Sequence, residues 1–449
     1  MAAGAASRPA DRRVSRRVPA LAPDCEILRL AFPALGALAA EPLYVLVDTA
    51  IVGHLGTPQL ASLAIAATLL ATAFTIFNFL TYGTTAQVAR LHGAGRAEEA
   101  ARLGAQAQWL ALLIGAALLV AVAALARPLV VLMGGEGEVA DGATTYLRIA
   151  ALGAPAFMLA SAGQGYLRGI GDLRTPLVIL VVAHLVNVVL ELLFVYGFGW
   201  GLAGSAWGTV IAQLGMGGAF LAVQLRAGWQ RPVPGRMRAL MRVGSEIAVR
   251  TTALLAAFLV ASAVLARVGP ATLGAHQIAF QLFIFLALVL DALAIAAQVM
   301  VGRMLGAGDA VAARTAAGRM IAWSSVLGAA FGILLLALGD AIPRLFTGDG
   351  AVVGQAREIW WLFAAMMPLN GAVFALDGIL IGAGDTRFLM WGTLAASAVY
   401  VPVAVLALVN DWGIFGIWCG LAGLIVVRLV TCGARFAGDR WARTGLPAT

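Results

Sequence analysis

The chain has 449 residues, of which 61% are hydrophobic and only 12% are charged. Because a soluble domain carries about 25% charged residues, this composition excludes a water-soluble globular protein and indicates a chain whose solvent is lipid. The net charge of +8 comes from arginine, since the sequence contains no lysine. In a membrane protein such charge lies in loops and sets the topology, so nucleic-acid binding is not expected.

Apolar runs of spanning length recur along the whole chain, and about 20 apolar helical residues cross a bilayer. We therefore predict twelve transmembrane helices, near residues 28–53, 59–83, 103–126, 143–166, 176–198, 202–225, 244–267, 272–301, 316–338, 353–380, 388–409 and 412–434. Residues 1–24 are rich in Arg, Ala and Pro and lack the apolar stretch of a signal peptide. They are predicted to form a disordered cytoplasmic tail.

Arginine placement orients the chain. Arginines precede the first span and follow every second span, whereas the alternate loops are short and poor in arginine. Because cytoplasmic loops carry an excess of positive charge, both termini are predicted to be cytoplasmic, in a multi-pass protein of the inner membrane. The arginines that carry this argument are Arg12, Arg16, Arg90, Arg96, Arg168, Arg174, Arg231, Arg236, Arg303, Arg314, Arg387 and Arg435.

The two halves of the chain repeat one another. The segment GQGYLRGIGDLRTP (163–176) resembles LDGILIGAGDTRF (376–388), and the loop aspartates Asp172 and Asp385 are 213 positions apart. The same interval relates HGAG (92–95) to LGAG (305–308). Each half holds six spans, an even number, so both halves enter the membrane from the same side and the repeats are parallel.

This organisation predicts an all-α membrane protein of two parallel six-helix repeats around a central cavity. We expect an N-terminal lobe at 25–225, a cytoplasmic linker at 226–242, a C-terminal lobe at 243–436 and a cytoplasmic tail at 437–449. Many secondary transporters are built from two such bundles, and a receptor or a membrane enzyme would not need the duplication.

Polar side chains interrupt the first, fifth and sixth predicted spans, and ionisable groups inside a bilayer are costly enough to suggest a function. Asp48, Glu191 and Thr209 each lie within about eight residues, or roughly 12 Å of helix, of the outer end of their span. We expect one pocket in the outer half of the N-terminal lobe, beside a kink at Pro42. The candidates are Glu41, Asp48, His184, Asn187, Glu191 and Thr209.

Two chemistries fit these residues. Carboxyl groups in a site shielded from water favour their neutral form, so Asp48, Glu191 and Glu41 could carry H⁺. The oxygen atoms of Asp48, Asn187, Glu191 and Thr209 could equally hold Na⁺, which as a hard cation suits oxygen ligands. A purely structural role, in which these groups hydrogen-bond the helices together, stays open. No other cofactor is expected, since Cys25, Cys419 and Cys432 form no metal-binding spacing.

The second half differs from the first at these positions. At the repeat interval Asp48 corresponds to Ala261. The C-terminal half has its own interior charges, Arg250, Asp291 and Asp377, for which we expect a structural ion pair of Arg250 with either Asp291 or Asp377. Coupling chemistry is therefore expected in the N-terminal half.

Several segments together carry a family likeness. LYVLVDTAIVGHLG (43–56), NVVLELLFVYGFGWGLAGSAWGTVIAQ (187–213) and VGRMLGAGD (301–309) resemble the multidrug and toxic compound extrusion (MATE) family. IAVRTTALL (247–255) and VLDALAIAAQ (289–298) resemble its DinF-type branch. The resemblance covers nearly the whole chain after residue 25.

The resemblance implies an antiporter that exports drug-like, often cationic small molecules by alternating access, driven by H⁺ or Na⁺. Asp48, Asn187 and Thr209 match the coupling residues of DinF-type members, and Glu191 stands where an aspartate is usual. A lipid-linked precursor flippase of the same superfamily and a non-transporting membrane scaffold are the alternatives. An enzyme is not expected, because no phosphate-binding loop or nucleophile triad is present. We expect the protein to be a monomer whose partners are its small-molecule substrate and the lipid bilayer.

Overall fold

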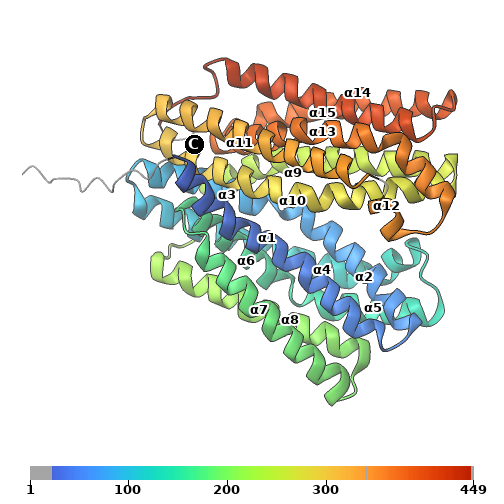
Figure 1. Ribbon diagram of the computed structural model, residues 1–449. Coiled ribbons are helices and arrows are strands. Elements are labelled where there is room, and N and C mark those ends of the chain that lie inside the picture. The colour runs from blue at the N-terminus through green and yellow to red at the C-terminus, as the bar shows by residue number, and fades with distance from the viewer. Residues whose placement is uncertain (1–22, 340, 446–449) are drawn as a thin grey trace, which may run out of the picture.

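The computed structural model describes residues 23–339 and 341–445, and over these residues all regular structure is helical (Figure 1). Eleven helical segments are long and apolar enough to cross a membrane, and one bent helix pair supplies a twelfth span. The twelve predicted spans are therefore confirmed in number. The tail expected at 1–24 falls outside the described residues except for Pro23 and Asp24, which begin the first helix.

The first half contains α1 to α8, and a π-helical turn, η1, extends α7. Their bounds are α1 (Pro23–Gly53), α2 (Thr57–Phe77), α3 (Phe79–Gly93), α4 (Ala97–Leu132), α5 (Gly137–Ala151), α6 (Ala154–Gly169), α7 (Arg174–Leu192), η1 (Leu193–Gly197) and α8 (Gly201–Ala227). α2 and α3 form one span, broken at Asn78. α1 is continuous through Pro42.

The second half contains α9 to α15. Their bounds are α9 (Pro234–Val268), α10 (Pro270–Gly306), α11 (Ala310–Ala337), α12 (Ala341–Phe346), α13 (Gly350–Gly382), α14 (Thr386–Val409) and α15 (Gly413–Ala437). The connection between the halves is shorter than expected, because α8 ends at Ala227 and α9 already begins at Pro234. Proline suits a helix start, since the first helical positions need no backbone donor.

The span predicted at 143–166 is in fact two helices, α5 and α6, which meet at an angle of 51°. Pro155 lies in the first turn of α6 and has no backbone N–H. It therefore cannot continue the hydrogen-bond ladder of α5, and the helix ends and restarts in a new direction. Hydropathy alone does not register this break, because the two helices taken together are apolar enough to count as one span.

The two lobes pack together at one end of the molecule and diverge toward the other (Figure 1). The largest hydrophobic cluster joins the lobes through residues such as Leu30 of α1, Val88 of α3 and Met300 of α10. The two remaining clusters each belong to a single lobe. The joined end contains the arginine-bearing loops that follow α3, α6 and α10.

At the joined end α3 crosses α10 in close contact. A Cβ atom at Gly93 would lie 2.0 Å from the carbonyl oxygen of Arg303, and one at Gly306 would lie 2.1 Å from that of Arg90. The two glycines, like the two arginines, are 213 positions apart in the sequence. The crossing is therefore reciprocal: each helix places its glycine against the carbonyl of the arginine at the equivalent position of the other. Only glycine fits at either point.

The segment after α15 also contacts both lobes. Trp441 is 1% exposed and stacks on Phe436 with ring centres 5.2 Å apart. The guanidinium of Arg90, in the N-terminal lobe, donates to the carbonyl of Arg443 at 2.6 Å. The backbone N–H of Gly445 donates to the carbonyl of Leu305 at 3.1 Å. Residues 438–445 therefore lie across the crossing of α3 and α10.

Candidate functional site

A buried polar group forms where α1, α7 and α8 meet in the N-terminal lobe. Asp48 is 5% exposed and Glu191 is 0% exposed. The hydroxyl of Ser205 donates to Oδ1 of Asp48 at 2.8 Å, and the same hydroxyl is 3.3 Å from Oε1 of Glu191. One serine therefore joins the two acids.

Asn187 and Thr209 complete the group around Glu191. The amide of Asn187 fits with Nδ2 donating to Oε1 of Glu191 at 3.2 Å and Oδ1 accepting from the backbone N–H of Thr209 at 3.1 Å. The hydroxyl of Thr209 is 3.5 Å from Oε1 of Glu191 and 3.0 Å from the hydroxyl of Tyr44. Oε1 of Glu191 thus faces several donors at once.

The second oxygen of Glu191, Oε2, is buried and has no hydrogen-bond partner among the described residues. A buried polar oxygen without a partner is costly, because it has given up water and gained nothing in return. Oδ1 of Asp48 and Oε1 of Glu191 both face the hydroxyl of Ser205, so the two carboxyl groups lie close together. The arrangement can therefore accept a proton between the two acids.

A cavity of about 430 Å³ lies beside this group, at the end where the lobes diverge. Its wall includes Tyr146, Glu138 and Trp200. Tyr146 is also buried against the polar group, near Ser205 and Thr209. Tyr146 therefore belongs both to the wall of this cavity and to the surroundings of the buried acids.

The structure brings together four of the predicted residues: Asp48, Asn187, Glu191 and Thr209. His184 lies next to them and stacks on Tyr44, with ring centres 4.9 Å apart. Glu41 stays apart from the group. Its side chain is exposed, and it forms no hydrogen bond or ion pair with the described residues.

Three members of the group were not predicted from the sequence: Ser205, Tyr44 and Tyr146. A positional signal was present for two of them. Ser205 lies four residues before Thr209, and Tyr44 four residues before Asp48, so each shares a helix face with a predicted residue. Tyr146 lies on α5, which contains none of the predicted site residues.

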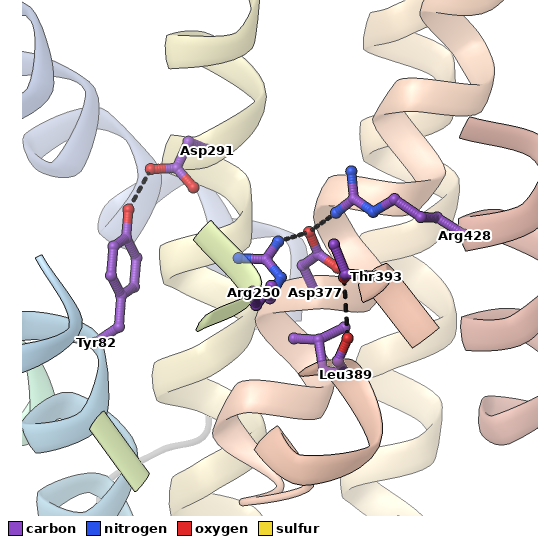
Figure 2. Close-up of polar contacts among 7 residues, drawn as sticks. All are labelled: Tyr82, Arg250, Asp291, Asp377, Leu389, Thr393 and Arg428. Atoms are coloured by element: carbon purple, nitrogen blue, oxygen red, sulfur yellow. Dashed lines mark hydrogen bonds and ion pairs between the residues drawn. The ribbon is translucent and has the colours of Figure 1, made fainter. Parts of the chain in front are cut away.

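The C-terminal lobe contains a separate group of charges (Figure 2). Asp377 forms ion pairs with both Arg250 and Arg428. Of the two pairings expected for Arg250, the structure contains the one with Asp377, while Asp291 accepts a hydrogen bond from the hydroxyl of Tyr82 at 2.8 Å. Arg428 was missed, although an arginine inside an apolar run is itself a signal.

The C-terminal lobe has no counterpart of the acid pair. The repeat-related positions of Asp48 and Glu191 are Ala261 and Ala404, both fully buried in the hydrophobic cluster of that lobe. Asn187 corresponds to Tyr400, which packs in the same cluster. The two halves therefore share their backbone and loops. At the positions of the acid pair, however, the C-terminal lobe has apolar side chains.

The profile of the MatE family matches residues 33–193 and again residues 247–406, so one family unit covers each half of the chain. Relatives align over most of their lengths. The multidrug resistance protein PmpM of Pseudomonas aeruginosa is 29% identical over 91% of this chain and 90% of its own. The DNA damage-inducible protein F of Escherichia coli is 28% identical over 90% of each chain. The chloroplastic Protein DETOXIFICATION 44 of Arabidopsis thaliana is 29% identical over 92% of this chain and 82% of its own.

Solved structures share the fold. A MATE in the bent conformation superposes with a TM-score of 0.85 at 22% identity, covering 92% of this chain and 96% of that one. The outward-facing conformation of a multidrug resistance MATE family transporter gives a TM-score of 0.83 at 21% identity over the same shares. The likeness read from the sequence motifs is thereby confirmed, and the chain is a membrane transporter, not an enzyme, that belongs to the MatE family.

Proposed function

We propose that this protein is an antiporter that exports small organic compounds, often cationic ones, and is driven by H⁺ entering through the group around Asp48 and Glu191. The observation that carries the proposal is the pair of buried acids joined by Ser205, with one oxygen of Glu191 left without a partner. The family supports efflux of small molecules across a bilayer. The coupling ion and the compounds carried are the proposed part.

Electrostatics favours a proton at this group. Two ionised carboxylates in contact repel each other strongly where water is excluded, so one proton shared between them is the favoured state. Na⁺ is the alternative, because oxygen atoms of Asp48, Asn187, Glu191, Ser205 and Thr209 lie close together and a hard cation prefers such ligands.

The orientation of the chain in the membrane determines from which side protons reach the acid group. If the arginine-rich end is cytoplasmic, as the charge distribution favours, the lobes are joined on the cytoplasmic side and diverge outward. The cavity beside Tyr146 then opens at the outer side. A proton arriving there would remove one negative charge from the pair Asp48 and Glu191, change the packing of α1 against α7 and α8, and so release the compound outward.

Transport by the purified protein in liposomes tests this function. A panel of fluorescent cations is loaded, and a pH gradient and a Na⁺ gradient are imposed separately. We expect the pH gradient to drive transport of the fluorescent cations. The rate should be at least tenfold lower in Asp48→Asn, because the amide cannot carry the proton. Asp411→Asn serves as a matched control, since Asp411 is exposed and lies far along the chain in the other lobe.

Two results would count against this assignment. An Asp48→Asn variant that exports at the wild-type rate would remove the acid pair from the mechanism. Transport driven by the Na⁺ gradient at equal pH on both sides would replace H⁺ by Na⁺ while keeping the same residues.

A further inference from the structure

Asp291 is held across the boundary between the lobes (Figure 2). It lies on α10, in the C-terminal lobe, and accepts a hydrogen bond of 2.8 Å from Tyr82 on α3, in the N-terminal lobe. Gln298, also on α10, donates to the backbone carbonyl of Tyr82 at 2.6 Å. Arg168 of α6, again in the N-terminal lobe, is near enough to attract Asp291 electrostatically. The groups that stabilise this carboxylate therefore belong mainly to the other lobe.

The charges inside the C-terminal lobe are unevenly shared. Asp377 is paired with two arginines, Arg250 and Arg428, whereas Asp291 has neither. Arg250 and Arg428 each have an Nε that finds no partner in the described structure. Arg250 nevertheless lies within electrostatic reach of Asp291 as well as of Asp377. One cation can therefore serve either acid.

Alternating access, on which this inference rests, requires the lobes to separate at the end where they are now joined. Separation carries Tyr82 and Arg168 away from Asp291. A half-buried carboxylate that loses its partners is disfavoured, so a replacement from its own lobe would stabilise Asp291. Asp377 keeps Arg428 if Arg250 leaves it.

We propose that Asp291 is a switch that exchanges Tyr82 for Arg250 when the lobes separate. In the joined state Asp291 is bound by the tyrosine of the other lobe and Arg250 is bound by Asp377. In the separated state Arg250 pairs with Asp291, and Asp377 is held by Arg428 alone. The two pairings that the sequence allows for Arg250 thus belong to the two states of the transporter.

The test measures the separation of the lobes directly. Spin labels are placed on cysteines at Ala97 and Val311, which are exposed at the joined end on α4 and α11, after replacement of the three native cysteines. Distance distributions of the full-length protein in lipid nanodiscs give the ratio of separated to joined molecules. We expect Tyr82→Phe to raise this ratio roughly tenfold, because a hydrogen bond to a charged acceptor is lost from the joined state alone.

Asp291→Asn is expected to change the ratio of separated to joined molecules in the opposite direction. Its amide oxygen still accepts from Tyr82, so the joined state keeps its hydrogen bond, but a neutral side chain cannot pair with Arg250 in the separated state. We expect the ratio to fall, and Tyr82→Phe to have a smaller effect when combined with Asp291→Asn. Tyr166→Phe is the matched control, because Tyr166 belongs to the same cluster and its hydroxyl makes no hydrogen bond with the described residues.

If Tyr82→Phe leaves the ratio of separated to joined molecules unchanged, the proposal is overturned. Tyr82→Phe removes only one oxygen atom, so its result is sufficient to decide the proposal if Asp291→Asn does not fold. A ratio raised by both substitutions would make Asp291 a simple latch and exclude the exchange with Arg250. If the wild-type protein shows one distance under every condition, alternating access itself is refuted. If the lobes of the wild-type protein separate but the substitutions do not change the ratio, only the proposed switch is refuted.

Discussion

Ser205 occupies the central position in the acid group, between two carboxyl groups that belong to different helices. A hydroxyl has one proton to donate, so it satisfies one acid fully at a time. In the structure it favours Asp48, at 2.8 Å, over Glu191, at 3.3 Å. Because a hydroxyl rotates freely, Ser205 can follow a change in which acid is charged.

Replacing Ser205 by alanine isolates this contribution. The hydroxyl stabilises charged carboxylates, so its loss disfavours the charged state by roughly 1.5–3 kcal/mol. We expect Ser205→Ala to remain folded and to transport, with the pH of half-maximal transport displaced upward. The measurement is the initial rate of export from proteoliposomes across a series of external pH values.

Ser161→Ala supplies the comparison, since Ser161 is a buried serine of the same lobe whose hydroxyl donates only within its own helix, to the carbonyl of Phe157. A pH profile that moves equally in both variants would show that any buried hydroxyl has this effect, and the special role of Ser205 would be refuted.

The residues of the site differ in how far the sequence could predict them. Asp48 and Glu191 were found because a carboxylate inside an apolar helix is costly wherever it points. Glu41 satisfied the same criterion but lies apart from the group. The cost of placing a carboxylate in a membrane does not reveal which neighbouring helix the side chain will face, so this difference could not be predicted. Ser205 was missed for the converse reason, because small hydroxyl residues are common in helix contacts and are not costly.

At the scale of elements, the crossing of α3 and α10 controls how closely the lobes can approach. Carbonyl oxygens of one helix occupy the space where the other helix would carry a Cβ atom, at Gly93 and at Gly306. A methyl group at either position requires the helices to move apart. The separated state has no such contact and should not be affected.

We expect Gly93→Ala or Gly306→Ala to destabilise the joined state by about 1–3 kcal/mol, the usual cost of overpacking. The same spin-label distances report the result as a larger separated fraction. Gly318→Ala is the control, because Gly318 lies inside α11 with open space where its Cβ would be. Unchanged distances in both crossing variants would mean that this contact does not limit closure.

The helices themselves were largely predictable, because twelve apolar runs separated by arginine-bearing loops leave few other arrangements in a bilayer. Their ends were not. α4 and α9 begin before their predicted spans, at Ala97 and Pro234, since helical hydrogen bonds continue past the apolar residues. The bend between α5 and α6 depends on one proline, which hydropathy does not detect.

At the scale of the whole molecule, the lobes are alike in backbone and different in chemistry. The buried acids of the N-terminal lobe are replaced by alanines in a continuous apolar core, while the C-terminal lobe holds the arginine–aspartate group. In our proposal the first lobe responds to the ion and the second responds to the position of its neighbour. Figure 1 shows the two lobes side by side at the joined end, where one hydrophobic cluster includes residues of both.

A reversible link between the lobes tests whether this end must open during transport. A Cβ atom at Gly302 of α10 would lie 3.0 Å from that of Ala89 on α3, so a slight shift gives the spacing of a disulfide. In a chain without its native cysteines, we expect Ala89→Cys with Gly302→Cys to lose transport on oxidation and to regain it with a reductant. Full activity of the oxidised, cross-linked protein would show that export needs no opening there. The two single variants, oxidised in the same way, control for other effects.

The reciprocal crossing of α3 and α10 has the form of a two-fold symmetric dimer interface within a single chain. A surface that is complementary to itself is satisfied as soon as two copies of it exist, so one glycine-and-carbonyl patch supplies both sides of the contact. Gly93 and Gly306 should accordingly be equivalent in their effects. The acid pair and the arginine group have no such constraint, and each lobe was free to specialise while the shared contact kept the two halves in register.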